Sequence, residues 1–256
     1  MNLEEILEQS LARVDQPVGN AEKAISRQRL TQFIAFHYLP FNALRNHLYG
    51  TTKPSNPLTG EARRIGDFLV AAKVLDYCKG LYQSPNDNDI TRYLRGGWLE
   101  EYIFLCLREA GADECYYSLP IHWGDNNPPS CFEIDAAAYH ADNVVFASCK
   151  TLNPWPKDGT STQLRRFMSE ALSWEHLFSQ GRAKCLVVTT IEFIDRKRKT
   201  VRLSNLFEQA EYMNEVLVGM ETLDWDQMGK LGGRLIQGAA MEEIAHTEYE
   251  MELHCC

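Results

Sequence analysis

The first third of the chain is dominated by apolar residues at helical spacing. They recur three and four positions apart in residues 2–14, 21–38, 41–48 and 61–81. This period predicts four amphipathic helices, and we interpret Pro40 and Gly50 as stop signals between them. Since no alternation of strands and helices occurs before the polar segment 84–89, we expect residues 1–83 to form an N-terminal all-helical extension.

Strand patterns begin after a further helix, which is expected over residues 90–110 with a possible interruption at Gly96-Gly97. The later elements then alternate between strands and helices. We expect strands at 114–123, 131–139, 143–152, 183–190 and 216–218, and helices at 162–180 and 203–213, followed by terminal helices. This order implies an α/β sandwich with a mixed sheet, so we predict a second domain over residues 90–256.

The second and third predicted strands carry polar residues among apolar ones. In the second strand Glu133 and Asp135 share one face, and in the third Ser148 and Lys150 share a face. If the hairpin turns on Ala141-Asp142, opposed residues have numbers that sum to 283. Asp135 then lies opposite Ser148, and Glu133 lies opposite Lys150.

The preceding helix begins with two adjacent acids. On a helical wheel Glu100 falls at the border of the apolar arc of Leu99 and Ile103, while Glu101 falls beside Arg108 on the polar side. We therefore expect Glu100 to point toward the sheet and Glu101 to be a solvated acid.

Grouped carboxylates and a nearby lysine suit one kind of chemistry. Carboxylate oxygens are preferred ligands of Mg²⁺ and Mn²⁺. Such an ion binds a phosphate oxygen and activates water, while a lysine positions that water or neutralises the phosphate. The hairpin alone also fits a surface ion pair between Glu133 and Lys150, an arrangement that contributes little to stability.

Three segments carry a family resemblance: Gly96-Gly97-Trp98-Leu99-Glu100-Glu101-Tyr102, Glu133-Ile134-Asp135 and Cys149-Lys150-Thr151. Together they resemble the PD-(D/E)XK nuclease superfamily, and are most similar to the nuclease domain of CRISPR ancillary endonucleases in which a CARF sensor domain precedes a Gly-Gly-Trp-Leu-Glu helix. The resemblance implies a restriction-endonuclease-like mixed sheet flanked by helices. It also implies a Mg²⁺- or Mn²⁺-dependent endonuclease that hydrolyses DNA or RNA in defence or mobile-element biology. Residues 1–83 are too short and too helical to match the CARF domain.

The resemblance assigns roles to individual residues. Glu100 matches the acid of the first helix, Asp135 the metal-binding aspartate and Lys150 the motif lysine, so Glu100 and Asp135 are the expected metal ligands. Gln163 is a possible match to a polar residue on the next helix. Ser148 departs from the pattern, because it stands where the family has Glu or Asp and cannot serve as an anionic ligand.

Three interpretations of Ser148 remain open. Another carboxylate can replace the missing acid, either Glu133 on the strand or Glu170 on the next helix, with Ser148 as an auxiliary group. The site can work weakly with Glu100 and Asp135 alone. Alternatively, the fold is an inactive nuclease that serves as a nucleic-acid-binding or protein-interaction module.

The uneven distribution of charge suggests where a nucleic acid binds. The net charge is −9, yet residues 21–80 contain nine Lys or Arg against four acids. Within that segment Arg27, Arg29, Arg63 and Arg64 are candidate nucleic-acid contacts, unless they are solvated helix faces.

The remaining features concern the tryptophans, membrane spans and oligomeric state. Trp155 and Trp174 are interpreted as packing residues rather than base-stacking platforms. No apolar run approaches the roughly 20 residues that span a bilayer, so we expect a cytoplasmic protein without a membrane partner. A homodimer, with contacts from the N-terminal extension, is also possible.

Overall fold

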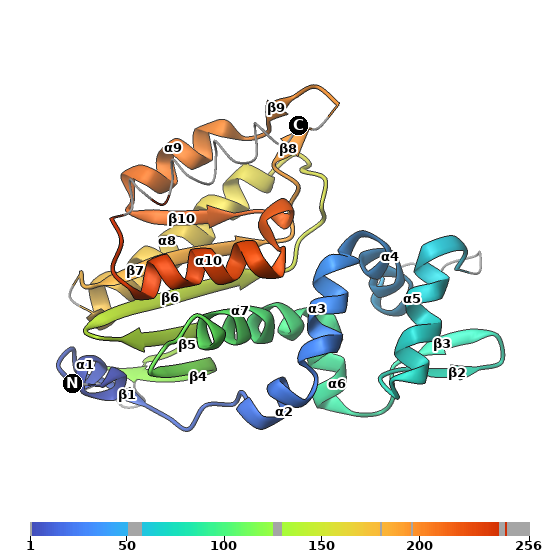
Figure 1. Cartoon of the computed structure of the whole chain (residues 1–256), viewed down its shortest axis with the longest axis horizontal. Coiled ribbons are helices and arrows are strands. Elements are labelled where there is room, and N and C mark those ends of the chain that lie inside the picture. Colours follow the sequence, from blue (N-terminus) through green and yellow to red (C-terminus); the bar gives the residue numbers. More distant parts are fainter. Residues whose placement is uncertain are drawn as a thin grey trace.

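A six-stranded mixed sheet forms the larger part of the molecule together with the helices on its faces (Figure 1). The computed structural model describes residues 2–50, 58–124, 130–179, 181–195, 197–240 and 244. Antiparallel neighbours are, in spatial order, β1 (Ala12–Val14), β4 (Glu114–Trp123), β5 (Ser130–His140) and β6 (Asn143–Lys150). Next to β6 and parallel to it lie β7 (Ala183–Thr189) and β10 (Glu215–Val218). The predicted restriction-endonuclease-like mixed sheet flanked by helices is confirmed.

Helices cover both faces of this sheet (Figure 1). One face packs against α7 (Trp98–Glu109) and α10 (Trp225–Ile236), and the other against α1 (Leu3–Glu8), α8 (Thr160–Ser179) and α9 (Ser204–Tyr212). Each face of the sheet has its own apolar core, and alternate residues of β6 are buried in one or the other. Val145 and Ala147 lie on the α7 side, and Val144 and Phe146 on the α8 side. Among the described helices, none has the length and apolar composition needed to cross a lipid bilayer.

The β5–β6 hairpin has the predicted register. Its paired residues run from Ala136 with Ala147 to His140 with Asn143, which all sum to 283. Ala141 and Asp142 have φ angles of 45° and 69°. Two consecutive residues with positive φ form the type I′ turn that matches the twist of a hairpin, so the turn forms here without an Asn-Gly sequence.

A local irregularity crosses β4 and β5 at the same level. Ser118 has a φ of 47°, and both it and Asp135 are skipped in the pairing of the two strands. The flanking pairs are Tyr117 with Ala136 and Leu119 with Ile134. Tyr117 and Ala136 belong to the α7-side core, whereas Leu119 and Ile134 belong to the α8-side core. The strands therefore reverse their faces here, and the predicted opposition of Asp135 and Ser148 does not form, because the β5–β6 ladder ends at Ala136.

The first 83 residues are mainly helical, as predicted, but they also contribute strands. The helices are α2 (Ala21–Ser26), α3 (Gln28–Phe36), α4 (Tyr38–Tyr49) and α5 (Gly60–Ala71). The end of the helix predicted over 2–14 is β1, because Leu11 takes a φ of 58°. Likewise a hairpin of β2 (Asp76–Cys78) and β3 (Leu81–Gln83) replaces the end of the helix predicted over 61–81, with Lys79-Gly80 as its turn.

The extension and the sheet are physically joined. β1 pairs with β4 at the edge of the sheet, and residues of α3, α4 and α5 share one apolar core with α7. The polar segment 84–89 leads into α6 (Asn88–Arg92). The division into separate domains at residues 83 and 90 stays a prediction.

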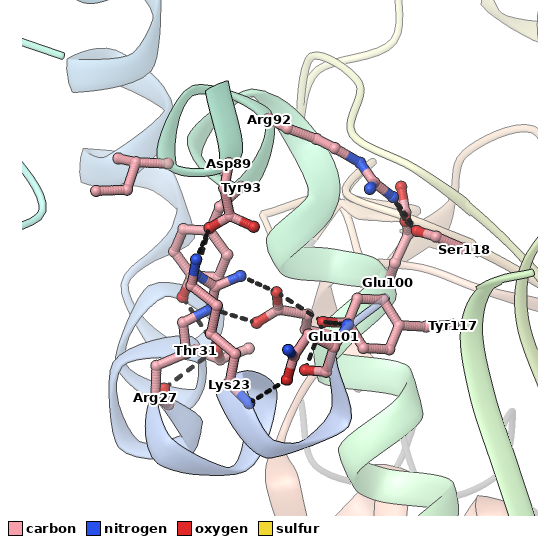
Figure 2. A network of polar contacts seen from close by, with 12 residues as sticks. Lys23, Arg27, Thr31, Asp89, Arg92, Tyr93, Glu100, Glu101, Tyr117 and Ser118 are labelled. Atoms are coloured by element: carbon pink, nitrogen blue, oxygen red, sulfur yellow. Dashed lines mark hydrogen bonds and ion pairs between the residues drawn. The ribbon is translucent and has the colours of Figure 1, made fainter. Parts of the chain in front are cut away.

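Residues of α7 are buried on every side, which corrects the expectation for Glu101. Glu101 is only 2% exposed, because α2 and α3 cover the side of α7 that was expected to face water (Figure 2). Arg27 meets it with two hydrogen bonds, of which the Nε to Oε2 bond is 2.8 Å long. Arg27 also pairs with Asp89 at 3.1 Å. Arg27 is thus engaged in ion pairs with Glu101 and Asp89, and its contact with nucleic acid stays a prediction.

Replacing Arg27, the cation of the buried pair with Glu101, should destabilise the fold. In Arg27→Ala the Glu101 carboxylate stays buried without its partner, so we expect the free energy of unfolding to fall by about 3 kcal/mol. Urea denaturation measures this change. Lys23→Ala is the matched control, because Lys23 forms a half-exposed pair with Asp89 that contributes less than about 1 kcal/mol. Equal losses in the two variants would contradict this interpretation.

Candidate active site

A kink before α7 positions the site. Tyr93–Gly97 form a π-helical turn, in which Gly96 leaves the helical conformation with φ 172° and ψ −24°. A Cβ at Gly96 would lie 2.9 Å from Thr151 Oγ1, so a larger residue here would have to displace the Thr151 side chain. Thr151 Oγ1 in turn donates to the Arg95 carbonyl at 3.2 Å. The predicted interruption at Gly96-Gly97 thus places the start of α7 against the end of β6, and such turns are frequent at functional sites.

Glu100 points toward the sheet, as predicted. Its Oε2 accepts hydrogen bonds from Ser118 Oγ at 2.5 Å and from Arg92 at 3.1 Å (Figure 2). Burial, followed by the charges of Asp135 and Glu133, raises the pKa of Glu100 to about 7, although Ser118 and Arg92 oppose the shift. The environment of this carboxyl therefore favours a bound proton or a cation.

Asp135 and Lys150 form the second part of the site. Asp135 Oδ2 accepts hydrogen bonds from the Cys149 amide at 2.7 Å and from Lys150 Nζ at 2.6 Å. Burial tends to lower the pKa of Lys150, but the charge of Asp135 and its hydrogen bond, with the charge of Glu170, raise it above the ordinary value. Lys150 therefore stays a cation at neutral pH.

Ser148 lies inside the sheet and does not join the polar cluster that Glu100, Asp135 and Lys150 form. It is fully buried and pairs with Val187 of β7. Within the described part of the chain, its hydroxyl finds no hydrogen-bond partner. The position of the missing acid therefore holds a small, unpartnered hydroxyl.

The two candidate substitutes for that acid lie on different sides of the cluster. Glu170 Oε2 is 3.8 Å from Lys150 Nζ, and the Phe167 ring lies under the same ammonium, with its centroid 5.5 Å away. Gln163 is exposed one turn before Phe167 on the same stripe of α8. Glu133 instead lies 3.6 Å from Arg92, so its predicted opposition to Lys150 does not form.

A cavity of about 450 Å³ opens beside Glu100. Its wall combines two arginines, the glycine pair, Glu100 and the residue before Lys150: Asn88, Thr91, Arg92, Arg95, Gly96, Gly97, Glu100 and Cys149. Guanidinium groups suit phosphate oxygens. Sequence reasoning missed Arg92, Arg95 and Ser118. The spacing of the two arginines, three residues apart directly before Gly96-Gly97, was the available signal.

The donor set is sparse for a metal ion. Across the described ranges, no group of three or more His, Cys, Asp or Glu side chains is arranged to hold a metal. Glu100 and Asp135 are nevertheless close enough for their like charges to interact. Two carboxylates fit Mg²⁺ or Mn²⁺ when water and a substrate phosphate complete the coordination.

The remaining predicted arginines lie outside this cluster. Arg29 on α3, and Arg63 and Arg64 on α5, are exposed. Arg63 lies 3.9 Å from Asp67 on its own helix. Their contact with nucleic acid stays a prediction, as does a homodimer.

Comparison with known proteins identifies the fold. No protein-family profile and no curated protein matches the chain. Solved structures do match. Protein VC1899 from Vibrio cholerae has a TM-score of 0.68 at 14% identity, and Can2 from Sulfobacillus thermosulfidooxidans, in complex with cyclic tetra-adenylate, has a TM-score of 0.56 at 16% identity.

The shared part is nearly all of this chain but only part of those proteins. The alignments cover 94% and 93% of this chain, against 63% and 61% of VC1899 and Can2. The chain thus spans about three fifths of the length of either protein. The N-terminal helices fall largely within the aligned part, so the likeness extends to the fold of the extension as well as the sheet.

The unpartnered hydroxyl of Ser148 leads to a stability prediction. A buried hydroxyl without a hydrogen bond destabilises the folded state, so Ser148→Ala should raise the free energy of unfolding by about 1 kcal/mol. Chemical denaturation measures the change. Ser179→Ala serves as the control, because the Ser179 hydroxyl is buried and hydrogen-bonded to the Glu175 carbonyl at 2.6 Å, and that variant should lose stability. A loss of stability in Ser148→Ala would show that its hydroxyl has a partner.

Glu100 should produce a pH dependence of stability. Its folded pKa of about 7 exceeds the ordinary 4.5, so between these values the folded protein retains a proton that the unfolded chain has lost. The free energy of unfolding should therefore fall as the pH rises from about 5 to about 8, by up to about 3 kcal/mol. Glu100→Gln should remove this part of the slope. Glu109→Gln, on an exposed position of the same helix, should leave it, and parallel curves for all three proteins would refute the shift.

Proposed function

We propose that this protein is a nuclease that hydrolyses phosphodiester bonds of DNA or RNA with the help of Mg²⁺ or Mn²⁺. The observation that carries the proposal is the convergence of Glu100 from α7, Asp135 from β5 and Lys150 from β6 beside a cavity with two arginines. The three residues are far apart in sequence and come from the elements that the sequence resemblance assigns to them. The likeness of the fold to VC1899 and Can2 is consistent with this proposal.

Glu100 and Asp135 are the proposed ligands of the metal ion. When bound, such an ion polarises a phosphate oxygen and lowers the pKa of a coordinated water. The raised pKa of Glu100 supports this assignment, because a carboxyl that resists ionisation alone becomes an anion readily next to a cation.

The chain's own cations hold the substrate. Lys150 presents a permanent positive charge next to Asp135, which suits a scissile phosphate or the water that attacks it. Arg92 and Arg95 line the neighbouring cavity and are proposed to bind flanking phosphates. Arg92 pairs with Glu100 and Glu133, so it would have to exchange these partners for a phosphate.

Glu170 is the better candidate for the missing acid. It approaches Lys150 at 3.8 Å from α8, which is the helix where a subgroup of restriction endonucleases resembling this pattern carries the acid. Glu133 is held toward Arg92 instead. A side chain that neighbours the lysine and remains partly exposed can turn toward a bound ion without disturbing the core.

A second candidate function has its own support. The short Asp135 to Lys150 contact and the buried Ser148 describe a cluster whose charges are partly satisfied internally. A nuclease fold that binds nucleic acid without cleaving it would keep such a cluster. A role in defence, proposed from the Gly-Gly-Trp-Leu-Glu resemblance and from the fold shared with Can2 in its cyclic tetra-adenylate complex, is compatible with either function.

A cleavage assay tests the proposal. Purified protein is incubated with plasmid, single-stranded DNA and RNA in Mg²⁺, in Mn²⁺ and in EDTA. We expect cleavage with a divalent ion only, and a loss of about 100-fold or more in Asp135→Asn and Lys150→Ala, because each removes a charge that acts on the reacting phosphate. Lys230→Ala, an exposed lysine on α10, is the control and should cleave normally.

The same assay separates the alternatives for the missing acid and for the function. Glu170→Gln should slow cleavage more than Glu133→Gln does. The reverse order would move the role to Glu133. Absence of cleavage under all conditions, or cleavage unchanged in both Asp135→Asn and Lys150→Ala, would reject the enzyme, and salt-sensitive binding without cleavage would favour the binding module.

A further inference from the structure

A second cavity, of about 670 Å³, lies beyond the candidate active site. It is formed where the loop after β6 meets a hairpin of β8 (Ile194–Asp195) and β9 (Thr200–Val201). Its wall contains an aromatic residue, three cations and two acids: Trp155, Pro156, Glu192, Asp195, Lys197, Arg198, Arg202 and Leu203. Nothing in the proposed cleavage chemistry accounts for this group.

Trp155 is not the packing residue that the sequence suggested. Its side chain is 54% exposed, whereas Trp174 is buried at 2%, as predicted. The loop that carries Trp155 is nevertheless well fixed. Its amide bonds to Asn153 Oδ1 at 3.0 Å, and the Pro154 carbonyl accepts from the Glu192 amide at 2.8 Å. A fixed backbone therefore presents a large aromatic surface to solvent at the wall of the cavity, next to the cations described below.

The opposite side of the cavity carries positive charge. Arg202 binds both acids of the wall, Glu192 at 2.7 Å and Asp195 at 3.2 Å, and so neutralises them in part. Lys197 and Arg198 are exposed. Their amides bond to Asp195 Oδ1 at 3.2 Å, but neither side chain forms an ion pair with a described residue. Their two charges are therefore available to an anion.

We propose that this cavity is a nucleotide subsite, in which a base of a bound nucleic-acid strand stacks on Trp155 and the adjoining phosphates lie against Lys197 and Arg198. Aromatic rings that stack on bases, beside cations that follow the backbone, are the general means of binding unpaired strands. The subsite rests on the proposed function, since it supplies grip on the strand that the active site cleaves.

The position of the cavity agrees with this role. Trp155 follows Lys150 by five residues, so the two lie at most roughly 17 Å apart along the chain. Lys150 is the last residue of β6, and the loop that follows runs beside the segment after β7, joined by the Leu152 amide to Thr190 Oγ1 at 2.8 Å. Both sites therefore lie at the carboxyl ends of parallel strands, where open α/β sheets commonly bind ligands.

Binding without cleavage tests the subsite. Fluorescence anisotropy of a short, labelled single-stranded oligonucleotide in EDTA gives the Kd for the full chain and its variants. We expect Trp155→Ala to weaken binding by about tenfold, because one stacked base is lost, and Trp155→Phe to retain most of the affinity. Lys197→Ala with Arg198→Ala should weaken binding and reduce the salt slope by about 1.4, or about 0.7 for each lost phosphate contact.

Matched controls lie elsewhere on the surface. Tyr212→Ala removes an exposed aromatic residue at the far end of α9, and Lys230→Ala removes an exposed cation on α10. Both should bind as the wild type does. Unchanged binding in Trp155→Ala, or equal weakening in the two controls, would overturn the subsite whether or not the wild type cleaves.

The outcome is separable from that of the proposed function. If the wild type fails to cleave but binding depends on Trp155, the subsite stands and the nuclease falls. If cleavage depends on Asp135 but binding ignores Trp155, the nuclease stands and the subsite falls. Adenosine monophosphate is included as a competitor. Displacement of the oligonucleotide by this mononucleotide at equal concentration would overturn the assignment to a strand in favour of a free nucleotide.

Discussion

Burial of α7 on all sides is the constraint on which the site depends. The helix begins with two adjacent acids, and burying a carboxylate is costly unless a cation or a proton meets it. The two are treated differently. Glu101 has a largely buried partner in Arg27, supplied by the N-terminal extension. Glu100 has a half-exposed partner in Arg92, on the wall of a cavity. The pair of Arg27 and Glu101 fixes the helix in place. In the second pair, another cation can replace Arg92 as the partner of Glu100.

The sheet supplies the second carboxylate of the site, Asp135, which does not take part in the pairing of β4 with β5. At Ser118 and Asp135 the strands β4 and β5 reverse their faces. Ser118 then donates to Glu100, while Asp135 accepts from the Cys149 amide and from Lys150. A regular pair of strands would direct these side chains into a core. The irregularity therefore links the helix acid to the hairpin lysine through groups that lie between them.

Much of this arrangement follows from sequence, and the exceptions have physical causes. Period-two and helical patterns located the strands of the main sheet from Glu114 onward, and the sum of 283 gave the hairpin register, whereas the two-residue strands β8 and β9 were not predicted. The helical wheel predicted that Glu101 faces solvent, whereas it is buried. A wheel describes one helix alone and cannot show that other helices cover its polar side. The reversal at Ser118 was also invisible, since a positive φ at serine has no sequence signal. Strands β1, β2 and β3 are short and sit in segments whose apolar spacing also suits a helix.

The balance of charge supports the proposal that a divalent ion binds at this site. The ion pairs that meet here join four carboxylates, Glu100, Asp135, Glu133 and Glu170, with two cations, Arg92 and Lys150. With Glu100 ionised, the carboxylates exceed these two cations by two formal charges, which would disfavour the approach of a phosphodiester. Burial first, and then the charges of Asp135 and Glu133, raise the pKa of Glu100 and so oppose its ionisation. In the proposed nuclease, a divalent cation held by Glu100 and Asp135 would offset this repulsion, and Arg92 would then be able to leave Glu100 for a phosphate. The serine at position 148 would then be tolerated, because Glu170, which lies 3.8 Å from Lys150, would supply the carboxylate that this position lacks.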